Sequence, residues 1–162
     1  METIFYTFCN SPVGWLKLTS NRDCLLSLSF EEMKGESSPE IPQILKDGVQ
    51  QLDEYFKGSR KEFNLKLAPQ GSGFQQNIWK LVENVKYGQT ASYLEISVQS
   101  GSAKNTRAVG LANGKNPIPI IIPCHRIIGS NGKLTGYAGG LERKRWLLLH
   151  EQHYTTHNDR LF

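Results

Sequence analysis

The sequence lacks the features that mark membrane, secreted and zinc-finger proteins. No apolar run approaches the ~18 residues that a membrane-spanning helix needs. The N-terminus shows no basic stretch followed by an apolar one, so we expect no signal peptide. The three cysteines have neither a disulfide framework nor the Cys-x-x-Cys spacing of a zinc site. We therefore expect a cytoplasmic chain that binds no metal and keeps its thiols reduced.

The charge is unevenly distributed along the chain. Residues 1–69 hold 8 Lys and Arg against 10 Asp and Glu, whereas residues 70–162 hold 11 against 5. A basic half beside a slightly acidic one indicates that the C-terminal half meets an anion such as nucleic acid. A generic solubilising charge explains the same numbers.

The N-terminal half predicts a small sheet with one helix. Residues 3–9, 15–19 and 24–30 are apolar or β-branched and are separated by turn clusters, which predicts a three-stranded antiparallel meander. Apolar residues at helical spacing predict a helix over 44–56. Alternation over 63–67 predicts a short fourth strand.

The C-terminal half predicts mainly helices. A linker around Pro69 to Gly73 precedes a helix over 74–86, for which Ser72 and Gln75 form a capping box. Ser92 and Glu95 form a second box, which opens a helix to about Gln99. The tight turn Ser100-Gly101-Ser102 then leads to a helix over 103–113. Two short helices joined by a glycine-containing turn are typical of a helix-turn-helix.

Two further elements are predicted after residue 126. An Asn-Gly turn between Ile127-Ile128 and Leu134-Thr135 predicts a β-hairpin. A final helix is expected from Leu141 to about His153, and the tail to Phe162 shows no clear pattern.

One stretch carries the chemistry: Asn116-Pro-Ile-Pro-Ile-Ile-Ile-Pro-Cys-His-Arg126. Its three prolines exclude a helix or a central strand. A thiol next to a histidine and an arginine has two groups that favour the thiolate, its reactive form, so we expect a lowered thiol pKa. The alternative is an inert buried cysteine beside a solvated His-Arg pair.

The Pro-Cys-His-Arg motif resembles the active-site loop of the O6-alkylguanine-DNA alkyltransferases, also called methylated-DNA–protein-cysteine methyltransferases. The asparagine before the loop, Gly136-Tyr-Ala-Gly-Gly140 and Trp146-Leu-Leu-Leu-His-Glu151 fit the family's pattern. The resemblance is strong from about Phe74 to Glu151. It implies an α+β protein with a ribonuclease-H-like N-terminal domain over 1–69. A winged-helix-like C-terminal domain with a helix-turn-helix then covers 70–162.

The resemblance also implies roles for individual residues. Cys124 is the alkyl acceptor, His125 draws off its proton, and Glu151 orients the histidine. Asn116 is the hinge between the second helix and the loop, and Tyr93 protonates the departing guanine. A solvated glutamate, an ordinary Asn-Pro turn and a core tyrosine are the alternatives for these last three.

The helix over 103–113 has few long polar side chains. Small residues fit the minor groove, whose pattern is nearly sequence-blind, and by resemblance Arg107 enters the stack in place of the target base. An alanine-rich helix with one surface arginine is the alternative. The residues predicted to contact DNA are Ser102, Lys104, Thr106, Arg107, Ala108, Gly110 and Ser130. The residues predicted to line the base pocket are Pro119, Ile127, Tyr137, Ala138 and Gly139.

The expected function is single-turnover DNA repair by a methyltransferase. A monomer without a cofactor would bind double-stranded DNA, flip out O6-alkylguanine and keep its alkyl group on Cys124, with O4-alkylthymine as a second candidate substrate. Two other classes stay open. A Cys-His-Glu hydrolase would turn over repeatedly, and a lesion-binding module would recognise alkylated DNA without repairing it.

Overall fold

The computed structural model describes residues 2–159, with side chains as far as residue 155. The chain divides into two compact units, Met1–Gln70 and Gly71–Phe162. Within the described residues, no helix combines the length and apolar character needed to cross a bilayer.

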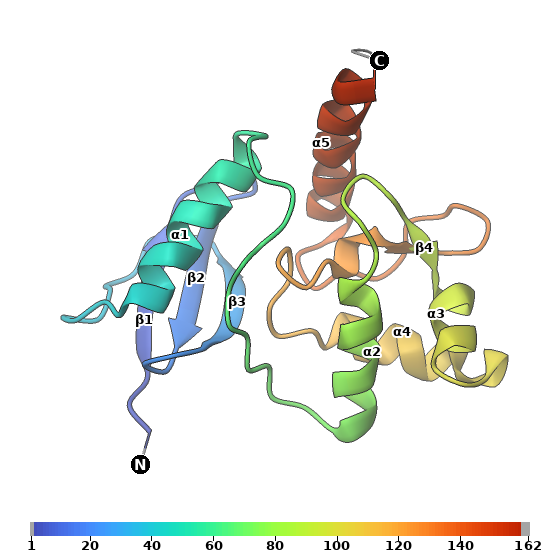
Figure 1. Cartoon of the computed structure of the whole chain (residues 1–162), viewed down its shortest axis with the longest axis horizontal. Helices are drawn as coiled ribbons and strands as arrows, with labels where there is room; N and C mark the ends of the chain where they lie inside the picture. The colour runs from blue at the N-terminus through green and yellow to red at the C-terminus, as the bar shows by residue number, and fades with distance from the viewer. Residues whose placement is uncertain (1, 160–162) are drawn as a thin grey trace. The chain divides into compact units, whose positions relative to one another are not determined.

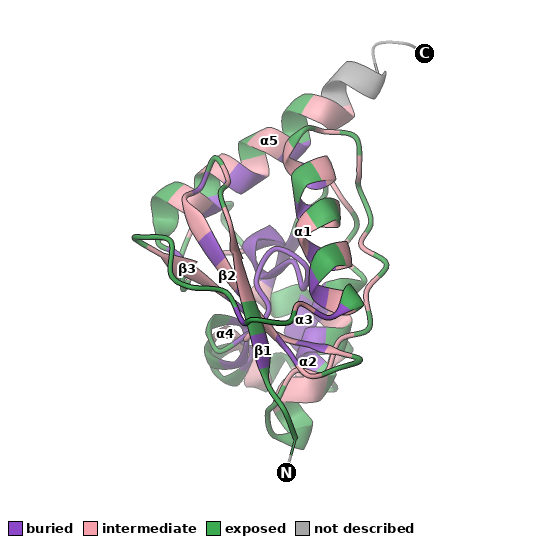
Figure 2. Cartoon of the chain, turned by 90° about the vertical axis from the view of Figure 1, so that its left-hand side faces the viewer, coloured by how far each residue is buried: buried purple, intermediate pink, exposed green. Residues whose placement is uncertain are grey.

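The first unit is built on an antiparallel sheet (Figure 1). Its strands, in the order β1-β2-β3, are β1 (Phe5–Cys9), β2 (Trp15–Ser20) and β3 (Leu25–Glu31). Alternate β2 residues are buried, with Leu16 and Leu18 fully enclosed. Figure 2 colours the chain by this burial. This period of two confirms the predicted meander.

Helix α1 (Gln43–Phe56) covers one face of this sheet. Leu45, Leu52 and Tyr55 supply its buried side. Gly48 allows the close approach, since a Cβ built there would lie 2.9 Å from Leu18 Cδ2. The helix predicted over 44–56 is therefore confirmed, and its apolar stripe forms the core with β2.

The strand predicted over 63–67 is wrong. This segment makes a single isolated bridge between Leu67 and Leu25, with Leu25 N donating to Lys66 O at 2.8 Å. Only the first residue of β3 meets it, so no ladder develops. The outer edge of β1 is instead covered by Ser38, whose Oγ accepts from Tyr6 N and whose N–H donates to Tyr6 O.

The second unit begins with two capped helices, α2 (Gly73–Glu83) and α3 (Tyr93–Gln99). Both predicted capping boxes are present, with Ser72 accepting from Gln75 N and Ser92 from Glu95 N. The next predicted helix is divided: Ser102 caps a 3₁₀ turn, η1 (Ala103–Asn105), and α4 (Thr106–Gly114) follows. Trp79 on α2 donates to Ala112 O at 2.8 Å and so fixes α4 against α2.

The hairpin predicted after residue 126 is wrong. β5 (Ile127–Ile128) pairs in parallel with β4 (Ala91–Ser92), and Leu134 and Thr135 belong to no strand. Gly129 N donates to Lys133 O, so the turn forms without a ladder beyond it. The last helix, α5 (Leu141–Asp159), extends past the predicted end at His153, and residues 160–162 of the predicted tail lie outside the described residues.

Candidate active site

Cys124 lies at the start of a buried turn, η2 (Cys124–Arg126), which follows Pro123. The turn places Cys124 N 2.7 Å from Ile122 O and leaves the cysteine only 3% exposed. The adjacent Cys and His therefore lie on a turn, in agreement with the expectation that this proline-rich stretch forms neither a regular helix nor a central strand. Four residues earlier, Ile120 has φ +74° although it is β-branched and fully buried. Such a conformation costs on the order of 1–3 kcal/mol and has to be held by its surroundings.

Two buried asparagines hold the loop that carries Cys124. Asn116 closes the loop on itself, because its Nδ2 donates to Ile122 O at 2.8 Å and its Oδ1 accepts from Ile118 N at 2.9 Å. Asn113, on α4, donates to Cys124 O at 3.2 Å. Both of these side-chain bonds stay within the loop, so the hinge role that the resemblance implies for Asn116 stays a prediction. The direct tie from the helix to the cysteine comes from Asn113, which sequence reasoning missed.

His125 and Glu151 form a buried pair. His125 Nε2 lies 2.6 Å from Glu151 Oε2, and the two side chains are 0% and 1% exposed. Burial lowers the pKa of His125, against the opposing pull of Glu151. The ring is therefore neutral at pH 7, with its proton on Nε2 facing the carboxylate. His125 Nδ1 then carries a lone pair and has no hydrogen-bond partner among the described residues.

Arg126 binds the same carboxylate from the other side. Its Nε donates to Glu151 Oε1 at 2.8 Å and its Nη2 to Oε2 at 3.0 Å, while Nη1 donates to Val85 O. Gly88 N adds a bond to Oε1 at 3.3 Å. Hydrogen bonds and ion pairs to His125 and Arg126 outweigh burial and hold the pKa of Glu151 well below its usual range.

The expected lowering of the thiol pKa is not found in the resting protein. Burial raises the pKa of Cys124 to about 11, while hydrogen bonding from Asn116 and the charge of Lys144 lower it in part. Arg126 contributes little because its guanidinium is committed to Glu151 and Val85 O. The resting thiol is therefore protonated at neutral pH, and its proton has to leave during the reaction.

Lys144 is a second site residue that sequence reasoning missed. It lies on α5 and is 0% exposed. Its ammonium donates to Ile127 O at 2.6 Å and to Thr135 O at 2.8 Å, and its Nζ lies 3.5 Å from the Tyr93 hydroxyl oxygen. A lysine between two arginines on a helix gives no sequence signal for burial, because its acceptors come from other segments of the chain.

A cavity of about 550 Å³ lies in the second unit, between α3, α4 and the loop before α5. Its lining includes Tyr93, Tyr137 and Ala138, which the sequence predicts for the active site, together with Thr106 and Gly110 from the predicted DNA-binding set. Gly114, Thr135 and Gly136 also line it and were not predicted.

The other predicted pocket residues are buried. Pro119, Ile127 and Gly139 lie in the interior and do not belong to the lining described above. Tyr93 donates from its hydroxyl to Thr135 O at 3.2 Å, which fixes the phenol at the cavity wall.

The remaining predicted DNA contacts lie at the surface. Lys104, Arg107, Ala108 and Ser130 are exposed, and Ser102 is partly exposed as the cap of η1. Arg107 stands in the first turn of α4, on the helix that also supplies Gly110 to the cavity. Exposed cations beside a cavity suit a polyanion that delivers a group into it.

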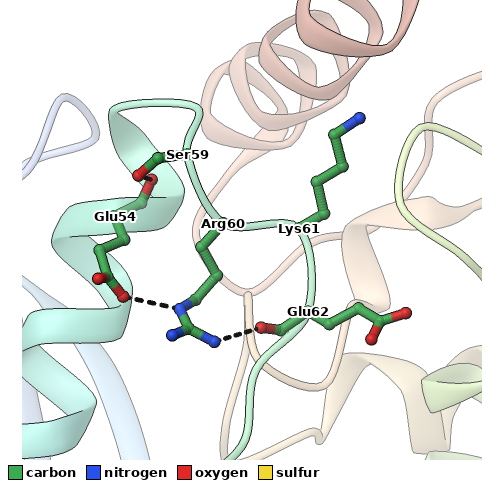
Figure 3. Close-up of a pocket in the computed structure, with 5 residues that line it drawn as sticks. All are labelled: Glu54, Ser59, Arg60, Lys61 and Glu62. Atoms are coloured by element: carbon green, nitrogen blue, oxygen red, sulfur yellow. Dashed lines mark hydrogen bonds and ion pairs between the residues drawn. The ribbon is translucent and has the colours of Figure 1, made fainter. Parts of the chain in front are cut away.

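A cavity of about 470 Å³ in the first unit is lined by side chains that hold the chain segment after α1 in place (Figure 3). Glu54 and Arg60 point toward each other, with Arg60 Nε donating to Glu54 Oε1 at 2.8 Å. Arg60 Nη1 donates to Glu62 O at 2.8 Å, so the guanidinium closes the chain after α1. These contacts provide no nucleophile or acid–base pair.

Comparison with known families identifies the family among the functional classes that the sequence left open. Residues 4–69 match the family model described as the ribonuclease-like domain of 6-O-methylguanine DNA methyltransferase, and residues 73–153 match its DNA binding domain. The chain belongs to this family. DNA is therefore a partner of this methyltransferase, and its activity is the repair of DNA by alkyl transfer to a protein cysteine.

Individual relatives of this 6-O-methylguanine DNA methyltransferase are similar over nearly their whole length. A methylated-DNA–protein-cysteine methyltransferase from Methanosarcina barkeri is 46% identical over 156 residues, covering 92% of this chain and 98% of the relative. The crystal structure of the Mycobacterium tuberculosis O6-methylguanine methyltransferase has a TM-score of 0.85 at 44% identity, covering 94% of each chain. A structure of the M. tuberculosis protein in complex with DNA has a TM-score of 0.84 at 45% identity, covering 92% of this chain and 93% of that one. The predicted family, fold class and activity are thus confirmed.

Proposed function

We propose that this methyltransferase removes the alkyl group from O6-alkylguanine in double-stranded DNA and keeps it on Cys124, with O4-alkylthymine as a second candidate substrate. The carrying observation is a buried thiol that is adjacent in the chain to a buried, neutral imidazole, whose Nδ1 is open and whose Nε2 is bound to Glu151. The family membership supports the reaction type.

The alkylated base has to leave the helix to react. Cys124 is only 3% exposed, so it cannot touch an alkyl group inside a base stack. Extrusion of the base costs a few kcal/mol, less for a mispaired base. The cavity lined by Tyr93, Thr135 and Tyr137 is the space we assign to the extruded base.

The proton path follows from the histidine tautomer. His125 Nδ1 accepts the Cys124 proton, directly or through one water, and Glu151 stabilises the imidazolium that results. The thiolate attacks the alkyl carbon, so that the S–C bond forms as the C–O bond breaks. Tyr93 donates toward the departing guanine, which offsets its developing negative charge. The thiol loses one proton and the guanine gains one, so the overall proton count is unchanged.

The product explains why the protein acts once. A thioether has no acyl carbon for water to attack, so the alkyl group stays on the sulfur. The sulfur supplies both electrons of the new S–C bond, so we propose that the displacement needs no cofactor. We also propose that the protein acts as a monomer.

DNA contact is assigned to η1, α4 and the turn before Lys133. Small side chains at Ala108 and Gly110 allow close approach to a minor groove. Arg107 is assigned to the space that the extruded base leaves. Lys104, Ser102, Thr106 and Ser130 are assigned to the sugar-phosphate backbone.

Intact mass measurement after incubation with a duplex containing O6-methylguanine tests the proposal. We expect one added methylene per protein, mapped to the Cys124 peptide, and no reaction in Cys124→Ala. Cys24→Ala is the matched control and should react normally. An adduct on Cys9 or Cys24 would overturn the site, repeated turnover would favour a hydrolase, and binding without an adduct would favour a lesion-binding module.

A further inference from the structure

Asn113 is a buried asparagine near the C-terminal end of α4, with only 2% of its surface exposed. Its Nδ2 donates to Cys124 O at 3.2 Å, and the same carbonyl accepts from Ile127 N, the bond that closes the η2 turn. Among the described residues, the Asn113 bond is the one side-chain hydrogen bond that runs from α4 to this turn. The backbone bond shapes the turn, so the side-chain bond is what relates the turn to the helix.

The carboxamide oxygen of Asn113 has no comparable contact. It is buried and accepts no hydrogen bond among the described residues. Exchanging the two carboxamide atoms would set Oδ1 against Cys124 O, so the carbonyl fixes the orientation of the amide. A buried acceptor without a donor costs free energy, and an apolar side chain of the same size would pack at lower cost. The bond to Cys124 O is therefore the contribution of this asparagine, which indicates positioning rather than stability.

The helix that carries Asn113 also carries the proposed DNA contact. Arg107 stands in the first turn of α4, six residues before Asn113, which corresponds to about 9 Å along the helix axis. Trp79 Nε1 donates to Ala112 O at 2.8 Å, so the end of α4 that bears Asn113 is also fixed against α2. A duplex that binds α4 as proposed above is therefore placed relative to Cys124 by a short path.

The loop before Cys124 has to be held from outside. Ile120 has φ +74° and is fully buried, and such a conformation persists only where its surroundings fix it. The two side-chain bonds of Asn116 stay within the loop and do not anchor it to α4. Asn113 supplies an anchor on α4 at the cysteine's end of the loop.

We propose that Asn113 is a positioning residue for alkyl transfer from duplex DNA, which keeps the Cys124 turn aligned with a base that α4 delivers. This inference rests on the function proposed above. A base in a duplex is tied to its sugar-phosphate backbone, so its alkyl carbon cannot follow a displaced thiol. A free base can turn within the cavity and meet the thiol again. Misalignment therefore slows duplex repair more than reaction with a free base.

Asn113→Leu removes the bond and keeps the approximate size of the side chain. Single-turnover transfer from a saturating duplex that contains O6-benzylguanine should fall on the order of tenfold, and reaction with free O6-benzylguanine should fall about twofold at most. The affinity for the duplex should not change, because the loss arises after binding. Urea unfolding should show unchanged or higher stability, since the unpaired oxygen is removed together with the bond.

Fluorescence separates alignment from extrusion of the base. With 2-aminopurine beside the lesion and Cys124→Ala as the background, no transfer occurs and unstacking is measured alone. Asn113→Leu should retain the fluorescence rise, whereas Arg107→Ala should lose most of it. Asn84→Leu, the same substitution at an exposed asparagine just after α2, is the matched control and should change none of these quantities.

Equal losses on the duplex and the free base, or an undiminished duplex rate, would overturn the proposal. Asn113→Ala decides in the same way if Asn113→Leu does not fold, because it removes the carboxamide without adding an apolar branch. If neither variant folds, Asn113 serves folding and the proposal is also overturned. Failure of the proposed function is recognised separately, because the wild-type protein would then form no adduct on Cys124.

Discussion

The Arg126 guanidinium donates to both carboxylate oxygens of Glu151, at 2.8 and 3.0 Å. His125, the residue before Arg126, binds the same carboxylate. Glu151 therefore serves two partners. It orients His125 for the proton path, and it neutralises a guanidinium that is only 7% exposed. The sequence motif gives the two adjacent side chains, and the structure shows that one carboxylate holds both.

Glu151→Gln should therefore reduce stability as well as activity. Removing the carboxylate leaves the buried Arg126 charge uncompensated, which costs about 3–5 kcal/mol of unfolding free energy. It also removes the charge that stabilises the His125 imidazolium, so alkyl transfer at pH 7 should slow and recover in part at higher pH. Urea unfolding and single-turnover transfer measure the two effects.

Glu142→Gln, at the exposed start of α5, is the matched control and should change neither quantity. Unchanged stability in Glu151→Gln would contradict the dual role of Glu151. Equal pH profiles in folded wild type and Glu151→Gln would remove Glu151 from the proton path.

His125 should make the protein sensitive to mild acid. Burial lowers its pKa below the unfolded value of 6.5, so between these values the unfolded state binds more protons than the folded state. Stability should therefore fall as the pH drops from 7 to 5, by up to about 1.4 kcal/mol per pH unit. Glu151 adds to the loss only below its unfolded pKa of 4.5, because its folded pKa is lowered.

Urea unfolding at several pH values checks this dependence. His125→Asn should flatten it, while His153→Asn, at an exposed histidine on α5, should retain it. An unchanged slope in His125→Asn would show that another group takes up the proton.

Local signals made much of the second unit predictable. Ser72 and Ser92 each precede a glutamine or glutamate three residues on, and both capping boxes form as expected. The predicted hairpin failed because its outcome depends on distant partners. The carbonyls of Ile127 and Thr135 are both taken by Lys144, and β5 pairs with β4 instead.

The site shows the same division between local and distant information. The turn at Cys124 follows from the proline before it, whereas the thiol pKa depends on burial by segments far along the chain. The contact between His125 and Glu151 was expected only through family resemblance. Lys144 and Asn113 carry no local pattern, so only the assembled fold identifies them.

Gly88 should be intolerant of any side chain. It has φ +76°, its N–H donates to Glu151, and a Cβ built there would lie 2.2 Å from Thr155 Oγ1. Gly132 is a matched control, with φ +79° and nothing within 4 Å of a Cβ. Gly132→Ala should lose about 1–2 kcal/mol from its left-handed backbone alone. Gly88→Ala should lose more and should also slow alkyl transfer through Glu151.

Thermal and urea unfolding of both variants check the comparison. Thr155→Ala, added to Gly88→Ala, should restore part of the loss by removing the clash. Equal destabilisation of the two glycine variants would show that Thr155 yields without cost and that only backbone strain matters.

Arg107→Ala should slow repair of duplex DNA far more than reaction with free O6-benzylguanine. The exposed side chain in the first turn of α4 is proposed to fill the space left by the extruded base, and a free base needs no extrusion. The rate at saturating DNA should fall, because the defect lies after binding.

Lys115→Ala, at an exposed cation just beyond the other end of α4, is the control. It should weaken DNA binding in a salt-dependent way at most and leave the saturated rate intact. Single-turnover kinetics on both substrates measure these rates, and equal losses on duplex and free base in Arg107→Ala would place the arginine's action in the chemical step.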